Sequence, residues 1–380
     1  MEEKLKALIE ANDERNRYRW AKSWKEKGGK VIGVISSYVP EEVLSAAGIL
    51  PFRLTGTWSE NIDHARIYRP ENSCGFCNHL LESFLRGEFD FLDGVVAADI
   101  DQDVIRLLDV LLYLKKVPFC HIIHVPFTDT SELHFRFFSS EIERLADKLG
   151  ELVGKRIAKE AIFDSIRLYD KIREKMLLIY EMRKKDHPPL SGKEVLGLMT
   201  GITVMPRDEV LSEIENIFQY LQSRKTNLKS LSPRIMILSD MLDCPAYLEL
   251  IEDEGCIVVM DDMDTGVRYI DLPAFDQSDD PFYVLSRRYL KRHGSARMAT
   301  WGRQMKNIVD WVSEFRVDGV LGLPLAWCYP QQYRMPYVAK RLEEESIPHL
   351  FLDREYHFSN VGQLRTRIGA FIESLKERGK

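Results

Sequence analysis

The chain has 380 residues, of which 45% are hydrophobic and 29% are charged, and its formal net charge is -6. This length predicts two or three domains with a large core, and the mildly acidic balance without a long basic run argues against nucleic acid as a partner. No apolar run reaches the ~20 residues that a membrane-spanning helix needs. Because the charged N-terminus does not resemble a signal peptide, we expect a cytoplasmic protein.

The first third of the chain alternates short apolar runs with helical patterns. Residues 31–35 read Val-Ile-Gly-Val-Ile, which is typical of a strand buried on both faces. Pro40, Glu41 and Glu42 suit the first turn of a helix, where proline is tolerated and acidic side chains complement the dipole. The expected strands are 31–35, 51–54, 92–97 and 118–123, and the expected helices are 2–28, 40–48, 74–86 and 102–114.

Residues 131–226 carry long helical patterns instead. After His187, Pro188 and Pro189 interrupt them, Ser191 and Glu194 have the spacing of a capping box. A polar segment, 225–232, precedes a return of the alternating pattern. There the expected strands are 235–238, 256–260, 317–322 and 349–353, and the expected helices are 245–254, those around 283–314, 332–345 and 361–376.

Strands that alternate with helices predict right-handed βαβ units and mainly parallel sheets. We therefore expect an α/β protein with two Rossmann-like lobes. The expected parts are an N-terminal helix (1–28), a first α/β lobe (29–130), a helical connector (131–232) and a second α/β lobe (233–380). Ligands of such sheets bind beyond the carboxyl ends of the strands, where Ser36, Ser37 and Tyr38 follow the first strand.

The two expected lobes echo each other. Residues 92–96 read Leu-Asp-Gly-Val-Val, and residues 317–321 read Val-Asp-Gly-Val-Leu. An ancient duplication and the convergence of buried strands explain this likeness equally well.

Six cysteines stand at positions 74, 77, 120, 244, 256 and 328. In a reducing compartment cysteines serve as ligands, nucleophiles or core residues rather than as a disulfide framework. Cys74 and Cys77 are the only close pair, and they begin a helical pattern, where the dipole lowers the pKa of a thiol and favours metal binding. The pair can equally be redox-active, zinc-binding or inert. A metal site would draw its other ligands from distant parts of the chain.

The expected roles of the other four cysteines differ with their places in the predicted elements. Cys328 follows a strand at the sheet edge that binds ligands, although a buried small side chain is the alternative. Cys120 and Cys256 lie in apolar strands and are expected in the core. Cys244 precedes Pro245 at a helix start.

Other chemistry has little motif support. The sequence contains no dinucleotide-binding Gly-x-Gly-x-x-Gly, no phosphate-binding P-loop and no Gly-x-Ser-x-Gly elbow. Asp99, Asp101 and Asp103 stand where a strand passes into a helix, so we expect Asp101 or Asp103 to cap that helix. Ser37 and Tyr38 are candidate catalytic or substrate-contacting residues because their loop faces the expected site.

Two sets of stretches carry a resemblance to a known family. In the first half they are residues 37–42, 46–48, 50–51 and 53–54, Cys74 before its helix, and residues 89–96. In the second half they are residues 317–320, 327–328, 347–348, 352–353 and 362–367. Together these stretches resemble the 2-hydroxyacyl-CoA dehydratase and benzoyl-CoA reductase family, in the type of the 2-hydroxyglutaryl-CoA dehydratase D-component. The matches follow the family's order over nearly the whole chain.

The resemblance implies two flavodoxin-like lobes and an enzyme subunit that pairs with a homologous second large subunit. It implies a 4Fe-4S cluster between the lobes, which an ATP-hydrolysing iron–sulfur activator protein reduces. In the dehydratases one electron converts the acyl-CoA thioester into a ketyl radical that eliminates water, whereas in the reductases electrons enter an aromatic acyl-CoA ring. A non-catalytic electron-relay or scaffolding subunit is a further alternative.

By the same resemblance, Cys74 and Cys328 correspond to two of the three usual cluster cysteines. The third falls at Asp101 when the sequences are aligned by the Asp-Gly-Val-Val strand. Iron–sulfur clusters prefer thiolate, so we expect Cys77, one helical turn from Cys74, to replace it, ahead of Asp101 or Cys120. An altered or absent cluster is the remaining alternative.

Overall fold

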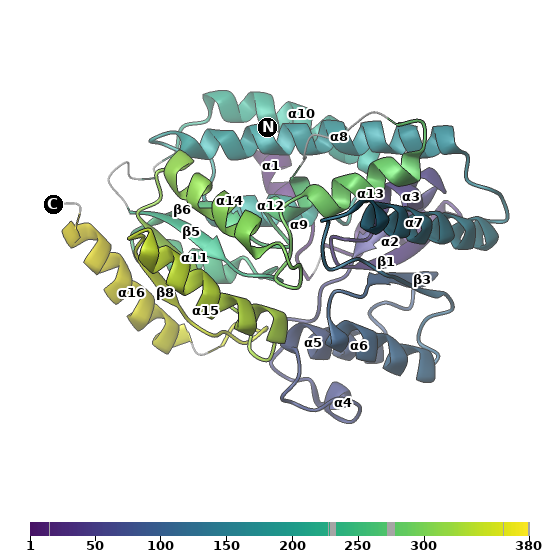
Figure 1. Cartoon of the computed structure of the whole chain (residues 1–380), viewed down its shortest axis with the longest axis horizontal. Coiled ribbons are helices and arrows are strands. Elements are labelled where there is room, and N and C mark those ends of the chain that lie inside the picture. Colours follow the sequence, from purple (N-terminus) through teal and green to yellow (C-terminus); the bar gives the residue numbers. More distant parts are fainter. Residues whose placement is uncertain (15, 227, 229–232, 272–277, 360, 379–380) are drawn as a thin grey trace.

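A computed structural model describes the chain except for residues 15, 227, 229–232, 272–277, 360 and 379–380. In this described part, two four-stranded parallel sheets lie side by side and helices cover them (Figure 1). The expected α/β fold with two flavodoxin-like lobes is confirmed. No helix of the described ranges is both long enough and apolar enough to cross a bilayer.

The two sheets share one strand order. The first has the order β2-β1-β3-β4 and the second has the order β6-β5-β7-β8, and every neighbouring pair is parallel. In such doubly wound sheets the ligand crevice opens where the strand order reverses, beyond the carboxyl ends of β1 and β3 or of β5 and β7. The strands are β1 (Lys30–Ile35), β2 (Ile49–Arg53), β3 (Gly94–Ala98), β4 (Cys120–Ile123), β5 (Arg234–Leu238), β6 (Ile257–Asp262), β7 (Gly319–Gly322) and β8 (His349–Phe351).

The helices fall into three groups along the chain. The first group is α1 (Glu2–Ile9), α2 (Arg19–Glu26), α3 (Glu41–Ala46), α4 (Asp63–Arg66), α5 (Gly75–Leu85) and α6 (Gln102–Tyr113). The middle group is α7 (Glu132–Val153), α8 (Lys159–Glu181), the 3-10 turn η1 (Met182–Lys184), α9 (Gly192–Gly201) and α10 (Arg207–Ser223). The last group is α11 (Ala246–Asp253), α12 (Val267–Ile270), α13 (Pro281–Lys291), α14 (Trp301–Glu314), α15 (Tyr329–Glu344) and α16 (Val361–Arg378).

The N-terminal segment, expected as one helix over 2–28, forms two. Helix α1 ends at Ile9 and α2 begins at Arg19. In between, Asp13 Oδ1 accepts a hydrogen bond from the N–H of Asn16 at 2.8 Å. Local hydrogen bonds of this kind compete with those of a continuous helix, which explains the break.

An Asp-Gly pair joins the third strand of each lobe to its first strand. The N–H of Asp93 donates to the carbonyl of Val31 at 2.8 Å, and Asp93 Oδ2 accepts from the N–H of Val31 at 2.8 Å. In the second lobe, Asp318 makes the same two bonds with Arg234, at 2.8 and 2.7 Å. The sequence echo at 92–96 and 317–321 is therefore also a repeated hydrogen-bond arrangement, which we call the Asp clasp.

The middle helices bind the two lobes together. Helix α8 runs along both lobes and packs against α3 as well as α12 and α13 (Figure 1). Although α13 falls in the range expected for the second lobe, its Phe282 and Leu285 join the core around Ile32 and Val34 of β1. The boundary expected at 232/233 lies next to residues 229–232, which are outside the described residues.

Candidate functional site

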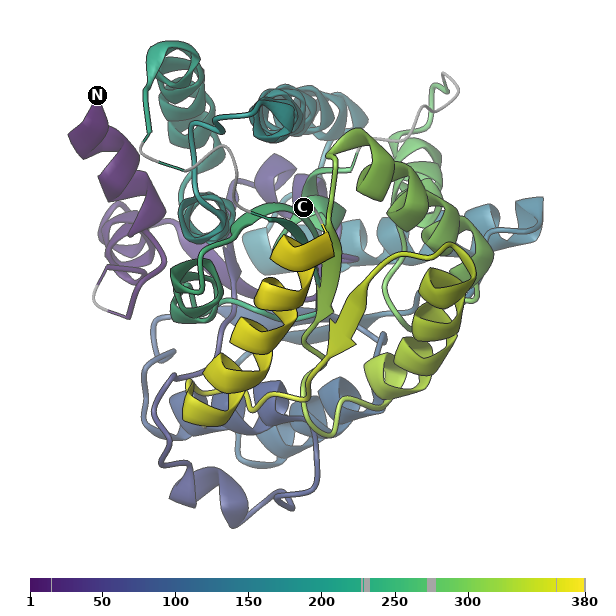
Figure 2. The same cartoon turned by 90° about the vertical axis from the view of Figure 1, so that its left-hand side faces the viewer.

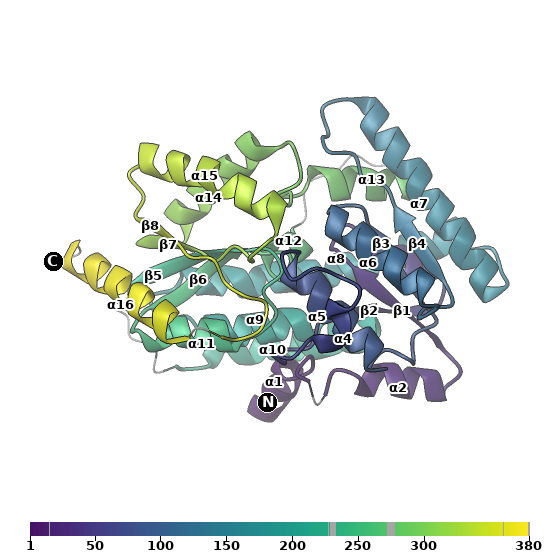
Figure 3. The same cartoon turned by 90° about the horizontal axis from the view of Figure 1, so that it is seen from below.

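The chain places three cysteines where the two lobes meet. Cys74 is the N-cap of α5, Cys77 lies in the first turn of that helix, and Cys328 is the N-cap of α15. Helix α5 lies at the boundary between the lobes (Figure 3). Its first residue, Gly75, stands so close to Tyr356 of the second lobe that a Cβ there would be 3.2 Å from the Cβ of Tyr356. All three thiols are buried.

The three thiols act on one another electrostatically. Hydrogen bonding from the thiols of Cys328 and Cys77 lowers the pKa of Cys74 well below its usual value. The N–H groups at the start of α5 lower it further, as expected at a helix N-terminus. The same thiol contacts raise the pKa of Cys77 and of Cys328. The arrangement therefore favours a thiolate at Cys74 between two thiols.

Two carboxyl groups, one from each lobe, lie next to the cysteines. Asp101 is the N-cap of α6 and accepts from the N–H of Asp103 at 2.9 Å, so its expected capping role is confirmed. Burial, and then the charge of Cys74, raise the pKa of Asp101 to about 7. From the second lobe, burial raises the pKa of Asp240 to about 6, and the charge of Asp240 raises the pKa of Cys328.

Asp103 links the cysteines to the protein frame. Its Oδ2 accepts a hydrogen bond from the N–H of Cys74 at 3.3 Å, and its Oδ1 pairs with Arg69. Arg69 in turn donates to Asn78 Oδ1 at 2.8 Å. This chain of contacts holds the start of α5 against the start of α6.

The donor set determines which group the site can hold. Within the described residues, no group of three or more His, Cys, Asp or Glu side chains is arranged to hold a single metal ion. An iron–sulfur cluster is bound differently, because each thiolate binds its own iron and the sulfurs need not converge on one point. Three buried thiols, one of them favoured as a thiolate, fit the chemistry of such a cluster. Asp101 adds an oxygen donor beside them.

The other three cysteines lie elsewhere. Cys120 pairs with Val95 near the amino ends of the first sheet's strands, away from the carboxyl-end site, and burial raises its pKa to about 11. Burial also raises the pKa of Cys244 to about 11. Cys256 donates its S–H to the carbonyl of Ile251 at 3.1 Å and is part of the second lobe's core, as expected.

Ser37 and Tyr38 are buried between the lobes. Ser37 contacts Asp264 and accepts a hydrogen bond from Arg292 at 2.9 Å. The Tyr38 hydroxyl accepts from the N–H of Ser295 at 3.3 Å, and the guanidinium of Arg292 lies 4.4 Å from the centre of its ring. Both side chains thus have protein partners from the second half of the chain. Their catalytic role stays a prediction.

Glu41 and Glu42 do more than complement the dipole of α3, which was the simplest expectation from the sequence. Both are buried, and Glu41 binds Arg207 at 2.7 Å. Glu42 binds Arg173 of α8 at 2.6 Å and accepts from the hydroxyl of Tyr289 of α13 at 2.7 Å. These contacts tie α3 to helices that follow it by more than a hundred positions.

The sequence did not identify Asp240 as a neighbour of the cysteines, because an acid just after a strand has the same local pattern whether it caps a helix or faces a site. The repeated lobe architecture offered a signal. If both lobes have the same strand order, each binds ligands beyond the carboxyl ends of its first and third strands. Residues that follow β3, β5 and β7 are therefore candidates to meet at one site. Asp101, Asp240 and Cys328 follow those three strands.

Comparison with known proteins gives matches along nearly the whole chain. A family model described as 2-hydroxyglutaryl-CoA dehydratase, D-component, matches residues 36–375. The (R)-phenyllactyl-CoA dehydratase beta subunit of Clostridium sporogenes is 25% identical over 366 residues, covering 93% of this chain and 94% of that protein. The beta subunit of (R)-2-hydroxyglutaryl-CoA dehydratase from Acidaminococcus fermentans is 23% identical, with 93% and 94% covered. A benzoyl-CoA reductase subunit of Thauera aromatica is 24% identical, with 94% of each chain covered.

Proposed function

The chain belongs to the 2-hydroxyglutaryl-CoA dehydratase D-component family, and from this membership we propose that it is an iron–sulfur subunit of a 2-hydroxyacyl-CoA dehydratase. The proposed reaction removes the 2-hydroxyl group and a proton from C3 of the acyl-CoA as water. One electron enters the thioester carbonyl before the elimination and is returned afterwards, so the overall reaction is redox-neutral.

The observation that carries the proposal is the meeting of Cys74, Cys77 and Cys328 at the boundary between the lobes. These three residues would hold a 4Fe-4S cluster, with Asp101 as the alternative to Cys77. When bound, such a cluster supplies a one-electron reductant and an iron that can act as a Lewis acid toward a hydroxyl group.

The chain's own residues prepare this site. The N-terminus of α5 stabilises negative charge on Cys74, and burial of all three thiols excludes water from them. Asp103 fixes the start of α5 through the N–H of Cys74. Asp101 would hold a proton on its carboxyl group at pH values below about 7.

We propose two protein partners. The relatives are themselves named as subunits, two of dehydratases and one of a reductase, which supports a second, homologous large subunit. The low potential that a thioester ketyl requires supports an ATP-dependent iron–sulfur activator as the electron donor.

A ring-reducing subunit is the second candidate. The reductase relative is 24% identical to this chain, and the two dehydratase relatives are 25% and 23% identical, so identity does not separate the two activities. Assay of the reconstituted enzyme with benzoyl-CoA and with a 2-hydroxyacyl-CoA distinguishes them. Dehydration without ring reduction supports the proposal, and ring reduction alone replaces it.

Anaerobic purification with iron and sulfide analysis tests the cluster. We expect bound iron and sulfide in the wild type and their loss in Cys74→Ser, Cys77→Ser and Cys328→Ser. Cys120→Ser is the matched control, since the same substitution at the opposite end of the sheet should leave the iron content unchanged. Circular dichroism verifies that each variant is folded.

Other results would contradict the assignment. A wild type that lacks iron when purified anaerobically with its co-expressed partners would refute a cluster in this chain and favour a scaffolding role. Iron lost in Asp101→Ala but kept in Cys77→Ser would make Asp101 the third ligand. Iron lost only in Cys120→Ser would show that the cluster lies elsewhere.

A further inference from the structure

A small interior cavity lies where the N-terminal segment meets both lobes. Asn12, between α1 and α2, lines it together with Arg53 at the end of β2, Thr203 after α9 and Asp264 after β6. All four residues are buried. Helix α1 packs against α9, and Figure 2 shows the purple N-terminal helix beside the teal helices of the middle group. This packing brings Asn12 to the place where the lobes meet.

Two side chains of the cavity have polar atoms without a hydrogen-bond partner among the described residues. These atoms are Nδ2 and Oδ1 of Asn12 and Nη1 of Arg53. Asn12 is 3% exposed and Arg53 is 4% exposed, so bulk solvent does not reach these atoms. Buried donors and acceptors of folded proteins are almost always paired, either with protein or with an ordered water. The unpaired atoms therefore indicate an occupant of the cavity.

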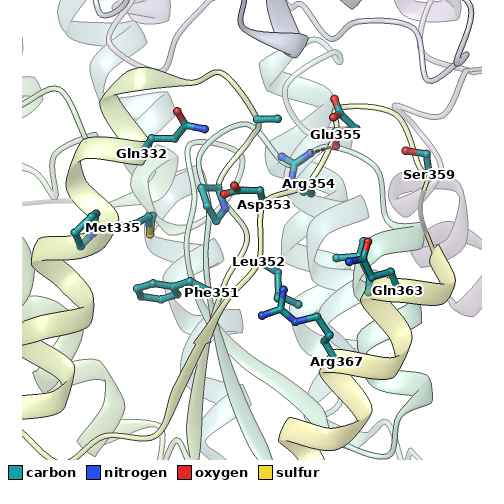
Figure 4. Close-up of a pocket in the computed structure, with 14 residues that line it drawn as sticks. Gln332, Met335, Phe351, Leu352, Asp353, Arg354, Glu355, Ser359, Gln363 and Arg367 are labelled. Carbon is teal, nitrogen blue, oxygen red and sulfur yellow. Dashed lines mark hydrogen bonds between the residues drawn. The ribbon is translucent and has the colours of Figure 1, made fainter. Parts of the chain in front are cut away.

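The size of the cavity limits that occupant. The centre of a water molecule has about 10 Å³ in which to move, which is about the space that one buried water needs. The open cavity beside β8 is different, since it has about 640 Å³ and is lined by Asp353 and Glu355 as well as by Arg354 and Arg367 (Figure 4). Neither size nor charge selects one ligand there, whereas the interior cavity admits only a very small molecule or ion.

The charges of the lining select water over an ion. Arg53 Nη2 pairs with Asp264 Oδ2, so the guanidinium and the carboxylate neutralise each other. An anion in the cavity would face the carboxylate of Asp264, and a cation would face the guanidinium of Arg53. Water instead accepts a hydrogen bond from Arg53 Nη1 and pairs with either end of the Asn12 amide. The carboxylate of Asp264 and the hydroxyl oxygen of Thr203 can accept the remaining hydrogens of the water.

We propose that this cavity holds one ordered water molecule, which bridges the N-terminal segment to the two lobes. The water extends a buried network toward the carboxyl end of the first sheet, since Asp264 pairs with Arg53 and also contacts Ser37 in the loop after β1. Asn12 thereby helps to hold the Ser37 loop in place, although it lies outside both sheets. The inference goes beyond the proposed function and does not depend on the cluster or on the substrate.

A crystal structure of the anaerobically purified protein with its co-expressed partners tests this assignment. At a resolution that shows ordered water, we expect one peak of electron density within about 2.7–3.2 Å of Arg53 Nη1 and of the Asn12 amide. Crystals soaked in bromide and in rubidium, both of which scatter X-rays anomalously, should show no anomalous peak there. An empty cavity would overturn the inference, and an anomalous peak would overturn it by assigning the site to an anion or a cation.

Asn12→Leu tests the role of the amide, because leucine has nearly the same size but a side chain without hydrogen-bonding groups. We expect the peak to be absent from its structure and its thermal unfolding midpoint to fall. Asn216→Leu is the matched control, since Asn216 is exposed on α10 and donates to the carbonyl of Ser212 of its own helix at 3.0 Å. That variant should keep the peak and a midpoint near that of the wild type. A peak that stays in Asn12→Leu would contradict the inference.

If Asn12→Leu does not fold, Asn12→Ser takes its place. Serine is shorter and retains a hydroxyl group, so we expect its structure to keep the bridging water and to add a second one. A dry cavity in this variant would overturn the inference. Iron content is measured on the same preparations. If the wild type lacks iron but shows the water, the proposed function fails and this inference stands, and normal iron with an empty cavity gives the reverse.

Discussion

Replacing Glu42 by alanine removes a carboxylate that joins three helices. Glu42 is fully buried on α3, and its two oxygens bind Arg173 at 2.6 Å and the Tyr289 hydroxyl at 2.7 Å. Burial by itself raises the pKa of Glu42, but the charges of Arg173 and Arg288 outweigh it and hold that pKa below its usual value. Glu42 and Arg173 therefore form an ionised pair in the folded protein at neutral pH.

The expected loss of unfolding free energy depends on the burial of the ion pair and not on the distance between its charged atoms. In the Glu42→Ala variant, Arg173 keeps its charge inside the protein without its carboxylate partner, which costs about 3–5 kcal/mol of unfolding free energy. The control is Glu213→Ala, since Glu213 pairs with Lys4 at a similar 3.0 Å on the surface. Exposed pairs contribute about 0.2–1 kcal/mol, so the control should lose no more than that.

Urea unfolding followed by far-UV circular dichroism measures both losses. A double variant, Glu42→Leu with Arg173→Leu, should lose less than Glu42→Ala alone, because apolar side chains of similar size leave no orphaned charge. A loss in Glu42→Ala that is no larger than in Glu213→Ala would refute the reasoning. A double variant less stable than the single one would show that packing, and not the unpaired charge, sets the cost.

Two further predictions concern pH and backbone packing. Burial raises the pKa of Asp262, but Arg268 and other cations outweigh burial and hold that pKa well below its usual value. The stability that the ionised Asp262 contributes is therefore complete above the pKa of an unfolded aspartate, about 3.9. It is lost as the pH falls through the lower pKa of the folded state. The difference in unfolding free energy between wild type and Asp262→Asn should therefore shrink as the pH is lowered below about 4, and a constant difference in acid titrations would contradict this. Gly94→Ala should destabilise the fold by about 1–3 kcal/mol, because the new Cβ would lie 2.5 Å from the carbonyl oxygen of Phe119. Gly302→Ala lies in helix α14, and among the described residues no atom beyond its chain neighbours and the nearby backbone of that helix lies within 4 Å of the new Cβ. This substitution should raise stability by about 0.5–1 kcal/mol, and thermal melts that rank the two variants the other way would refute the packing argument.

The sequence predicts what local signals determine. Strand β1 and helices α5 and α6 were placed within one or two residues, because continuous apolar runs and capping residues act over a few positions. The capping role of Asp101 was predictable in the same way, because its hydrogen-bond partner, the N–H of Asp103, is only two positions away. Elements of this kind could be placed without knowing the rest of the structure.

Contacts between distant parts of the chain could not be predicted in this way. Glu42 and Tyr289 are 247 positions apart, and a pair of acids after Pro40 has the same local pattern whether it faces solvent or buried arginines. For the same reason, no local pattern places Cys328 beside Cys74. The resemblance to a family suggested that pair, and the fold then brought Asp240 to the same place.

The Asp clasp shows how one scaffold can serve two different chemistries. Asp93 and Asp318 make the same two bonds in the two lobes, and each precedes a strand that leads to a helix of the same topological position. The cap of that helix is a carboxylate, Asp101, in one lobe and a thiol, Cys328, in the other. The same position of the frame thus presents a carboxylate that caps its helix in the first lobe and, in the second, a thiol that makes no cap bond within the described residues, so one scaffold supplies two different donors to the site.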